Sequence, residues 1–422
     1  MQTMAPAVAT GAVGLGRLVA VMTAVMLSLG CTESPTEPPV PDIPTGRRLA
    51  ASAVHTCLIT SQGGLVCWGR FRGTIEEFPP TPVAPASDTT LRFTSISAGS
   101  VTCAISATQR LYCWGLNLYG ELGDGTRLAR STPTPVATDL AFAEVGVGVY
   151  STCARTAGGE LYCWGRGDYG HLANGEAREG TVQPIPTRAN TPLRFSQLSP
   201  GFMFCGLATS GPTTSGRVYC WGAISGSFDP SLYVEPGNCG AFYVWWFLGS
   251  PCVSPTPLRG NVPLVAIQRG VGQTSCGLDA AGAAYCWGAG AYGTLGNGTA
   301  GEGTYAIDPV PVDGGHRFRQ VVSGGTMVCG LTEDGAAYCW GNNFRGQLGI
   351  GETPPVEWGI PVASRPLPVA GGHRFVEITV GNAHGCGLTT DEAVWCWGVG
   401  TEGQLGRAGT AGDAATPVRV VY

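Results

Sequence analysis

The chain repeats one pattern of apolar and polar positions seven times. Each unit begins with a short apolar stretch, such as residues 375–378 (Phe-Val-Glu-Ile), and continues through a Gly-rich turn into a segment with alternating neighbours. A turn containing Asp or Gly leads to a third segment ending in Cys-Trp-Gly, and a loop then leads to a Pro-x-Pro-Val segment. Four short segments separated by Gly and Pro turns predict four β-strands per unit.

The Cys-Trp-Gly tripeptide marks each repeat. Its seven copies begin at Cys67, Cys113, Cys163, Cys220, Cys286, Cys339 and Cys396. Successive copies lie roughly 50 residues apart, which suits a four-stranded propeller blade and is too long for most helical solenoid repeats. We therefore expect an all-β fold, a seven-bladed β-propeller over residues 47–422.

Each tripeptide is preceded by a second cysteine, ten residues earlier in six repeats and fifteen earlier in the fourth. These partners are Cys57, Cys103, Cys153, Cys205, Cys276, Cys329 and Cys386. Two cysteines facing each other across a hairpin lie within disulfide range, and each bridge would stabilise the fold by about 2–3 kcal/mol. The alternatives are reduced core cysteines or zinc, although no Cys-x-x-Cys spacing occurs.

The tryptophan of each tripeptide alternates with the cysteine and so points to the opposite face of its strand. Large flat side chains at seven equivalent positions suit packing between neighbouring blades. We predict core positions for Trp68, Trp114, Trp164, Trp221, Trp287, Trp340 and Trp397.

The turn after Trp-Gly reads Gly-Gln-Leu-Gly at residues 346–349 and 403–406, with variants at 120–123, 170–173 and 293–296. This pattern resembles the regulator of chromosome condensation repeat family over nearly all of residues 47–422. The resemblance implies a seven-bladed β-propeller. The nucleotide-exchange activity of one family member is not carried over, because the surfaces that it needs find no match in this sequence.

The N-terminus has the features of an export signal. An apolar run over residues 18–29 follows Arg17 and is too short to cross a bilayer, which needs about 20 residues. It ends in Leu-Ser-Leu-Gly-Cys at residues 27–31, which resembles a bacterial lipobox. We expect a lipoprotein signal over residues 1–30, lipid attachment at Cys31 and a Pro-rich spacer over 31–46. The alternative is an ordinary secretory signal cleaved nearby.

Charge and composition argue against several kinds of function. The chain carries 24 basic and 29 acidic residues, and the net charge of −5 argues against nucleic-acid binding. All the basic residues are arginine, so lysine-dependent chemistry has no candidate residue. The five histidines occupy repeat-equivalent positions, whereas catalysis needs one convergent site. We therefore predict no catalytic residue, no metal site and no cofactor.

Residues 223–254 break the repeat. This insert contains Cys239 and Cys252, which we expect to form an eighth disulfide around an aromatic stretch. Its candidate partner-binding residues are Phe242, Tyr243, Trp245, Trp246 and Phe247. The alternative is that these rings pack over the propeller and are hidden.

These features together predict a monomeric, non-enzymatic, lipid-anchored scaffold that binds a protein or glycan in the bacterial cell envelope, on the outer membrane or cell surface. The alternative is an envelope hydrolase or lyase at the mouth of the propeller channel, which would require carboxylates and histidines clustered there. We also expect the final segment, residues 417–421, to pair beside the first blade near residues 49–52 and close the ring.

Overall fold

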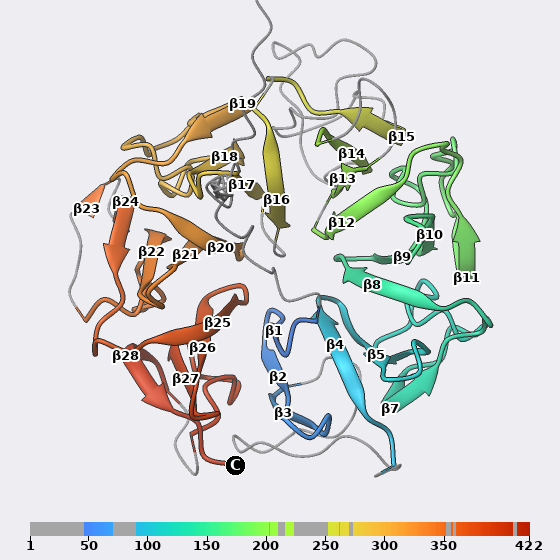
Figure 1. The fold of residues 1–422 in the computed structure, drawn as a ribbon, viewed down its shortest axis with the longest axis horizontal. Coiled ribbons are helices and arrows are strands. Elements are labelled where there is room, and N and C mark those ends of the chain that lie inside the picture. Colours follow the sequence, from blue (N-terminus) through green and yellow to red (C-terminus); the bar gives the residue numbers. More distant parts are fainter. Residues whose placement is uncertain are drawn as a thin grey trace, which may run out of the picture. The chain divides into compact units, whose positions relative to one another are not determined.

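The computed structural model describes residues 46–70, 90–201, 203–209, 216–222, 252–260, 262–269, 273–351, 356–357, 360–407 and 412–422. Every regular element in these ranges is a β-strand, and the strands form seven blades around a ring (Figure 1). The predicted seven-bladed all-β propeller is therefore confirmed. Within the same ranges we find no helix long and apolar enough to cross a membrane.

The blades follow one another along the chain, each running from its innermost to its outermost strand. Blade 1 contains β1 (Leu49–Ala51), β2 (His55–Ile59) and β3 (Leu65–Gly69); blade 2 contains β4 (Phe93–Ala98), β5 (Val101–Ser106), β6 (Leu111–Gly115) and β7 (Arg130–Pro135). Blade 3 contains β8 (Phe142–Val147), β9 (Ser151–Thr156), β10 (Leu161–Arg166) and β11 (Val182–Arg188); blade 4 contains β12 (Phe195–Ser199), β13 (Phe204–Ala208), β14 (Val218–Gly222) and β15 (Cys252–Pro257).

The second half of the ring continues the pattern. Blade 5 contains β16 (Leu264–Arg269), β17 (Thr274–Asp279), β18 (Ala284–Ala289) and β19 (Tyr305–Pro311). Blade 6 contains β20 (Phe318–Ser323), β21 (Met327–Thr332), β22 (Ala337–Asn342), β24 (Ile360–Pro368) and the two-residue edge strand β23 (Val356–Glu357). Blade 7 contains β25 (Phe375–Val380), β26 (His384–Thr389), β27 (Val394–Gly398) and β28 (Ala414–Arg419).

The central hairpin of every blade carries the predicted disulfide. The paired cysteines stand directly opposite each other in the strand register, with Cα–Cα distances of 4.0–4.1 Å. All fourteen are buried. The alternating position places the seven tryptophans in the core, each at most 3 % exposed, as the sequence predicts. The two alternatives for these fourteen cysteines, a zinc site and reduced thiols, are therefore wrong.

Polar side chains on the innermost strands fasten one blade to the next. Gln320 of blade 6 accepts a hydrogen bond from the Ile378 amide at 3.0 Å and donates one to the Ile378 carbonyl at 2.9 Å. Gln197 of blade 4 similarly accepts from the Ile267 amide at 3.0 Å. An innermost strand is a sheet edge with unpaired backbone groups, and these side chains satisfy them.

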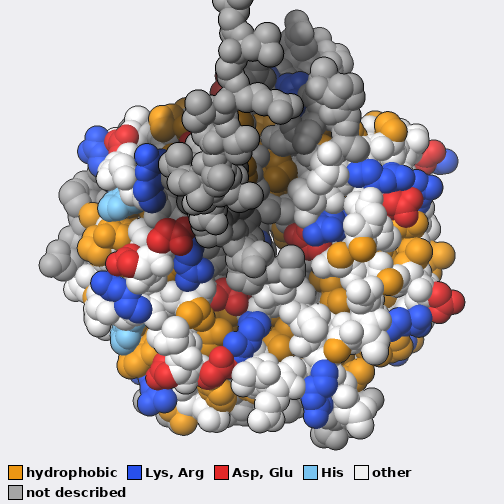
Figure 2. All heavy atoms as spheres, in the orientation of Figure 1, with side chains coloured by type: hydrophobic (Ala, Val, Ile, Leu, Met, Phe, Trp, Pro, Cys, Tyr) orange, Lys and Arg blue, Asp and Glu red, His pale blue; other side chains and the backbone are white. Residues whose placement is uncertain are grey.

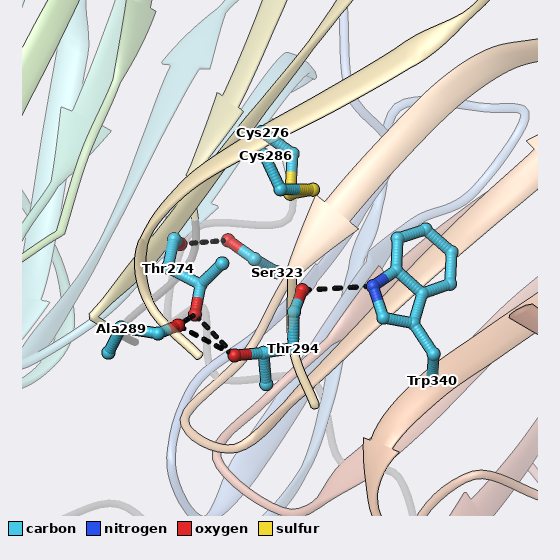
Figure 3. Close-up of a disulfide and its surroundings, with 7 residues drawn as sticks. All are labelled: Thr274, Cys276, Cys286, Ala289, Thr294, Ser323 and Trp340. Atoms are coloured by element: carbon cyan, nitrogen blue, oxygen red, sulfur yellow. Dashed lines mark hydrogen bonds between the residues drawn. A yellow bond between two sulfur atoms is a disulfide. The ribbon is translucent and has the colours of Figure 1, made fainter. Parts of the chain in front are cut away.

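A second set of contacts joins blades through the tryptophans. The Trp340 indole of blade 6 donates to the carbonyl of Thr294, which lies in the turn after the Cys-Trp-Gly strand of blade 5, at 2.9 Å (Figure 3). In the same view the Ser323 hydroxyl of blade 6 donates to the Thr274 carbonyl of blade 5 at 3.0 Å. Trp68 and Trp164 make the equivalent bond to the preceding blade. The Gly-x-Leu-Gly turn is thus a fastening between blades.

The expected closure of the ring by the last segment is wrong. Strand β28 pairs with β27 as the outermost strand of blade 7, and β1 pairs with β2. Blades 7 and 1 instead meet through side chains: Glu377 accepts the amides of Arg48 and Leu49 at 3.1 and 3.2 Å. Arg48 also forms an ion pair with Glu392 of blade 7. Strand β28 thus completes the sheet of blade 7 instead of joining blade 1.

Two buried tryptophans allow the fastening bond to be measured. The Trp397 indole nitrogen is buried without a hydrogen-bond partner, whereas that of Trp340 donates to Thr294, and both side chains are fully buried. We expect Trp340→Phe to lower the free energy of unfolding by about 1 kcal/mol more than Trp397→Phe, because only the first change removes a hydrogen bond. Urea unfolding measures both. Equal losses would show that the indole bond contributes nothing.

Candidate functional site

The connection between β14 and β15 interrupts the ring of fastening turns. The other described connections at this position, in blades 2, 3, 5, 6 and 7, carry the Gly-x-Leu-Gly or Gly-x-Leu-Ala turn, but blade 4 carries the insert. Cys252 begins β15, is buried and is disulfide-bonded. The predicted partner Cys239, the five aromatic candidates and the lipid-attachment candidate Cys31 lie outside the described residues. Gly222 and Cys252 mark where the insert leaves and rejoins the propeller.

The face that carries these turns exposes apolar side chains. Leu118 and Phe344 occupy the same position in the turns of blades 2 and 6 and are 58 % and 68 % exposed. Tyr292 in the equivalent turn of blade 5 is 40 % exposed. Because the turns are repeat-equivalent, they surround the ring on the same face as the ends of the insert. The sequence carries only a partial signal for this surface, because an apolar or aromatic residue precedes the turn in blades 2, 3, 5 and 6 but Thr-Glu precedes it in blade 7.

An arginine and three tyrosines form a further cluster on this face at blades 2 and 3. The Arg166 guanidinium lies 4.8–5.2 Å from the ring centroids of Tyr119, Tyr150 and Tyr169 and pairs with Asp168 at 2.9 Å. Such cation–π contacts hold the surrounding loops together. The hydrogen bond to Asp168 helps to raise the pKa of Arg166.

Two of the five histidines are buried between blades. His55 Nε2 lies 2.7 Å from the Thr102 hydroxyl of blade 2, and His384 Nε2 lies 2.8 Å from the Thr56 hydroxyl of blade 1. Burial lowers the pKa of His55 to about 3 and that of His384 to about 4. Both are therefore neutral at physiological pH, and each forms a hydrogen bond between two neighbouring blades.

The other histidines are packed against aromatic rings. His316 lies 4.1 Å from the ring centroid of Tyr338, and His373 lies 4.0 Å from that of Trp395. His171, in the turn of blade 3, is buried beside Tyr169. The five histidines are therefore spread over blades 1, 3, 6 and 7, as their repeat positions predict.

Most of the charged side chains named below form ion pairs with each other. Exposed arginines lie beside acidic partners, such as Arg110 with Asp139 at 3.0 Å and Arg365 with Asp313 at 2.8 Å. On the face shown in Figure 2, basic and acidic side chains alternate around the ring. Among the described residues, no group of three or more histidines, cysteines and carboxylates could hold a metal ion.

The mouth of the channel does not bring carboxylates and histidines together in the described part of the chain. Its two carboxylates have structural partners: Glu144 accepts the Leu198 amide and pairs with Arg155, while Glu377 accepts the amides before and within β1. Burial raises the pKa of Glu377. We did not predict from the sequence that these side chains join blades. The signal is a Glu or Gln two residues after the repeat-equivalent Phe of blades 3, 4, 6 and 7.

Comparison with known proteins agrees with this geometry. One model of the regulator of chromosome condensation (RCC1) repeat matches residues 109–155, 158–207 and 334–388. A second model of the repeat matches residues 142–170, 318–347 and 375–404. These stretches of the chain therefore match the RCC1 repeat.

Curated proteins similar in sequence include several from eukaryotes. The mitochondrial RCC1 domain-containing protein RUG3 of Arabidopsis thaliana is 28 % identical over 218 residues, covering 51 % of this chain and 46 % of RUG3. The ultraviolet-B receptor UVR8 of the same plant is 26 % identical over 380 residues, covering 85 % of this chain and 78 % of UVR8. This chain thus spans less than half the length of RUG3 and most of UVR8.

Solved structures share the propeller fold. Prp20p of Saccharomyces cerevisiae, which has binding properties to Gsp1p and histones, superposes with a TM-score of 0.69 at 18 % identity, covering 86 % of this chain and 87 % of Prp20p. Human WBSCR16 superposes with a TM-score of 0.66 at 21 % identity, covering 82 % of this chain and 85 % of WBSCR16. At such identities the likeness concerns the fold alone.

Proposed function

We propose that this protein is a non-enzymatic binding scaffold of the bacterial cell envelope, exported and anchored through a lipid on Cys31. The observation that carries the proposal is the set of seven buried hairpin disulfides, one in each blade. Structural disulfides persist in oxidising compartments and are rare where thiols are kept reduced. The signal sequence and the spacer before the ring are consistent with that location.

A binding role is supported by where the chain departs from its repeat. The described histidines and the two channel carboxylates have structural partners, whereas the apolar side chains of Leu118, Tyr292 and Phe344 are exposed. Exposed apolar groups on one face are typical of protein-interaction surfaces. We propose that this face, together with the aromatic stretch of the insert, binds a protein partner. The RCC1-type relative Prp20p, which binds Gsp1p and histones, supports protein binding by such a ring.

The test is capture of the partner followed by a binding measurement with purified components. Immobilised mature protein is incubated with envelope extract, the captured protein is identified and purified, and its Kd is measured. We expect the triple variant Phe242→Ala, Trp245→Ala, Trp246→Ala and the double variant Leu118→Ser, Phe344→Ser each to weaken binding at least tenfold, since buried aromatic anchors dominate interfaces.

The matched control is Val265→Ser, which removes an apolar side chain that is 45 % exposed but lies in β16 rather than in a turn. This variant should bind as the unmodified protein does. Full binding by both the triple and the double variants would overturn the assignment of this face. Hydrolysis of an envelope substrate by the purified protein would favour the enzymatic alternative instead.

A further inference from the structure

A small cavity lies against the innermost strands of blades 2 to 5. Its volume is about 210 Å³, and its polar lining includes Arg47, Ser95, Glu144, Arg155 and Gln268. Pockets for drug-sized ligands occupy about 300–1,000 Å³, so this one suits a ligand of only a few heavy atoms. None of the described turn residues proposed above for protein binding lines it.

Arg47 is the unusual member of this lining. Its backbone is fixed, because its carbonyl accepts the Ile96 amide of blade 2 at 3.0 Å and the next amide is held by Glu377. Among the described residues, its guanidinium has no hydrogen-bond or ion-pair partner. Burial lowers the pKa of Arg47 although Glu144 and Glu377 attract its charge. A partly dehydrated cation with five donors and no acceptor is costly unless an anion is supplied.

The two neighbouring carboxylates make hydrogen bonds to other groups and, among the described residues, none to Arg47. Glu144 accepts the Leu198 amide at 3.0 Å and Arg155 Nε at 2.7 Å. Glu377 accepts two backbone amides of the segment that enters blade 1. Both carboxylates therefore help to hold one blade to the next, and neither is hydrogen-bonded to Arg47 in the described part of the chain.

The rest of the lining offers further donors. Arg155 bonds Glu144 through Nε, and neither of its terminal amino groups has a bond within the described residues. The side-chain amide of Gln268 and the hydroxyl of Ser95 are also without partners in that part of the chain. The lining thus contains many donors, one engaged carboxylate and two arginines, a formal charge of +1 that matches a monoanion.

We propose that this cavity binds a small monocarboxylate, whose oxygens accept hydrogen bonds from Arg47 and Gln268. A carboxylate matches the planar guanidinium in a bidentate pair. A phosphate shares the oxyanion chemistry, but its second negative charge would face Glu144 across a small cavity.

The test is saturable thermal stabilisation of the mature protein by sodium acetate, with sodium chloride at matched ionic strength as the reference. A ligand that binds only the folded state raises Tm with its concentration. We expect acetate to raise Tm saturably and chloride not to do so. Sodium phosphate forms the third arm, and a larger saturable shift with phosphate would overturn the carboxylate assignment.

Three variants locate the site. Arg47→Met should raise the apparent Kd for acetate at least about tenfold, which corresponds to losing a charge-assisted pair. Gln268→Leu tests the site independently and should weaken binding by a smaller factor. Arg110→Met, which removes an exposed arginine paired with Asp139, should leave the acetate response unchanged. No acetate shift, or an unchanged shift in both Arg47→Met and Gln268→Leu, would overturn the proposal.

Discussion

Refolding the mature protein in the presence of a reductant should prevent it from reaching the native state. Each hairpin disulfide constrains about ten residues of unfolded chain and contributes about 2–3 kcal/mol on the loop-entropy basis. Seven such constraints sum to about 15–20 kcal/mol, which exceeds the whole stability of a typical domain, about 5–15 kcal/mol. Circular dichroism and tryptophan fluorescence after refolding, with and without reductant, measure the difference.

A single hairpin provides the graded control. The double variant Cys329→Ala, Cys339→Ala removes one buried disulfide and should lower the free energy of unfolding by about 2–3 kcal/mol while leaving the ring folded. We expect the other residue pairs of β21 and β22 to keep the register that they have in the unmodified protein. A propeller that refolds equally well in reductant would show that the disulfides accompany the fold without stabilising it.

The second large effect is a loss of stability in mild acid. The pKa of His55 is lowered to about 3 and that of His384 to about 4 in the folded protein, whereas both return to about 6.5 on unfolding. The unfolded chain therefore binds more protons below about pH 6.5, and acid favours unfolding. We expect each histidine to remove about 2 kcal/mol of stability between pH 7.5 and pH 5.

Methionine is a suitable replacement for the two histidines in a test of this acid sensitivity. Met203 and Met327 occupy the same repeat position as the two histidines and are buried as they are. The double variant His55→Met, His384→Met should therefore pack acceptably, and its stability should depend much less on pH over the same interval. Urea unfolding at several pH values gives the comparison. A variant that loses stability with acid as steeply as the unmodified protein would assign the effect to other groups.

The repeat made the architecture predictable. Seven copies of Cys-Trp-Gly with a second cysteine upstream fix both the number of blades and the facing pairs, because each hairpin is a local structure. The tryptophans follow from strand alternation alone, and all seven are buried. The sequence of a hairpin fixes the register of its two strands, so it can be predicted without knowing which distant segments are in contact.

Contacts between blades were harder to predict. Ring closure depends on Glu377 meeting the amides of Arg48 and Leu49, more than 300 residues away in sequence, and no local pattern announces that pairing. Likewise, Arg47 looks unremarkable in sequence, and only the ring places it beside Arg155 and Gln268. The expected strand-exchange closure failed because blade 7 already completes its own sheet with β28.

The central claim is that this is an exported, lipid-anchored propeller held together by disulfides. Mass spectrometry of the mature protein, purified without reductant from the membrane fraction of the cells that make it, tests that claim most directly. The account predicts a chain that begins at Cys31, carries a diacylglycerol there and contains eight disulfides with no free thiol. An unprocessed N-terminus with free thiols at the hairpin cysteines would contradict it.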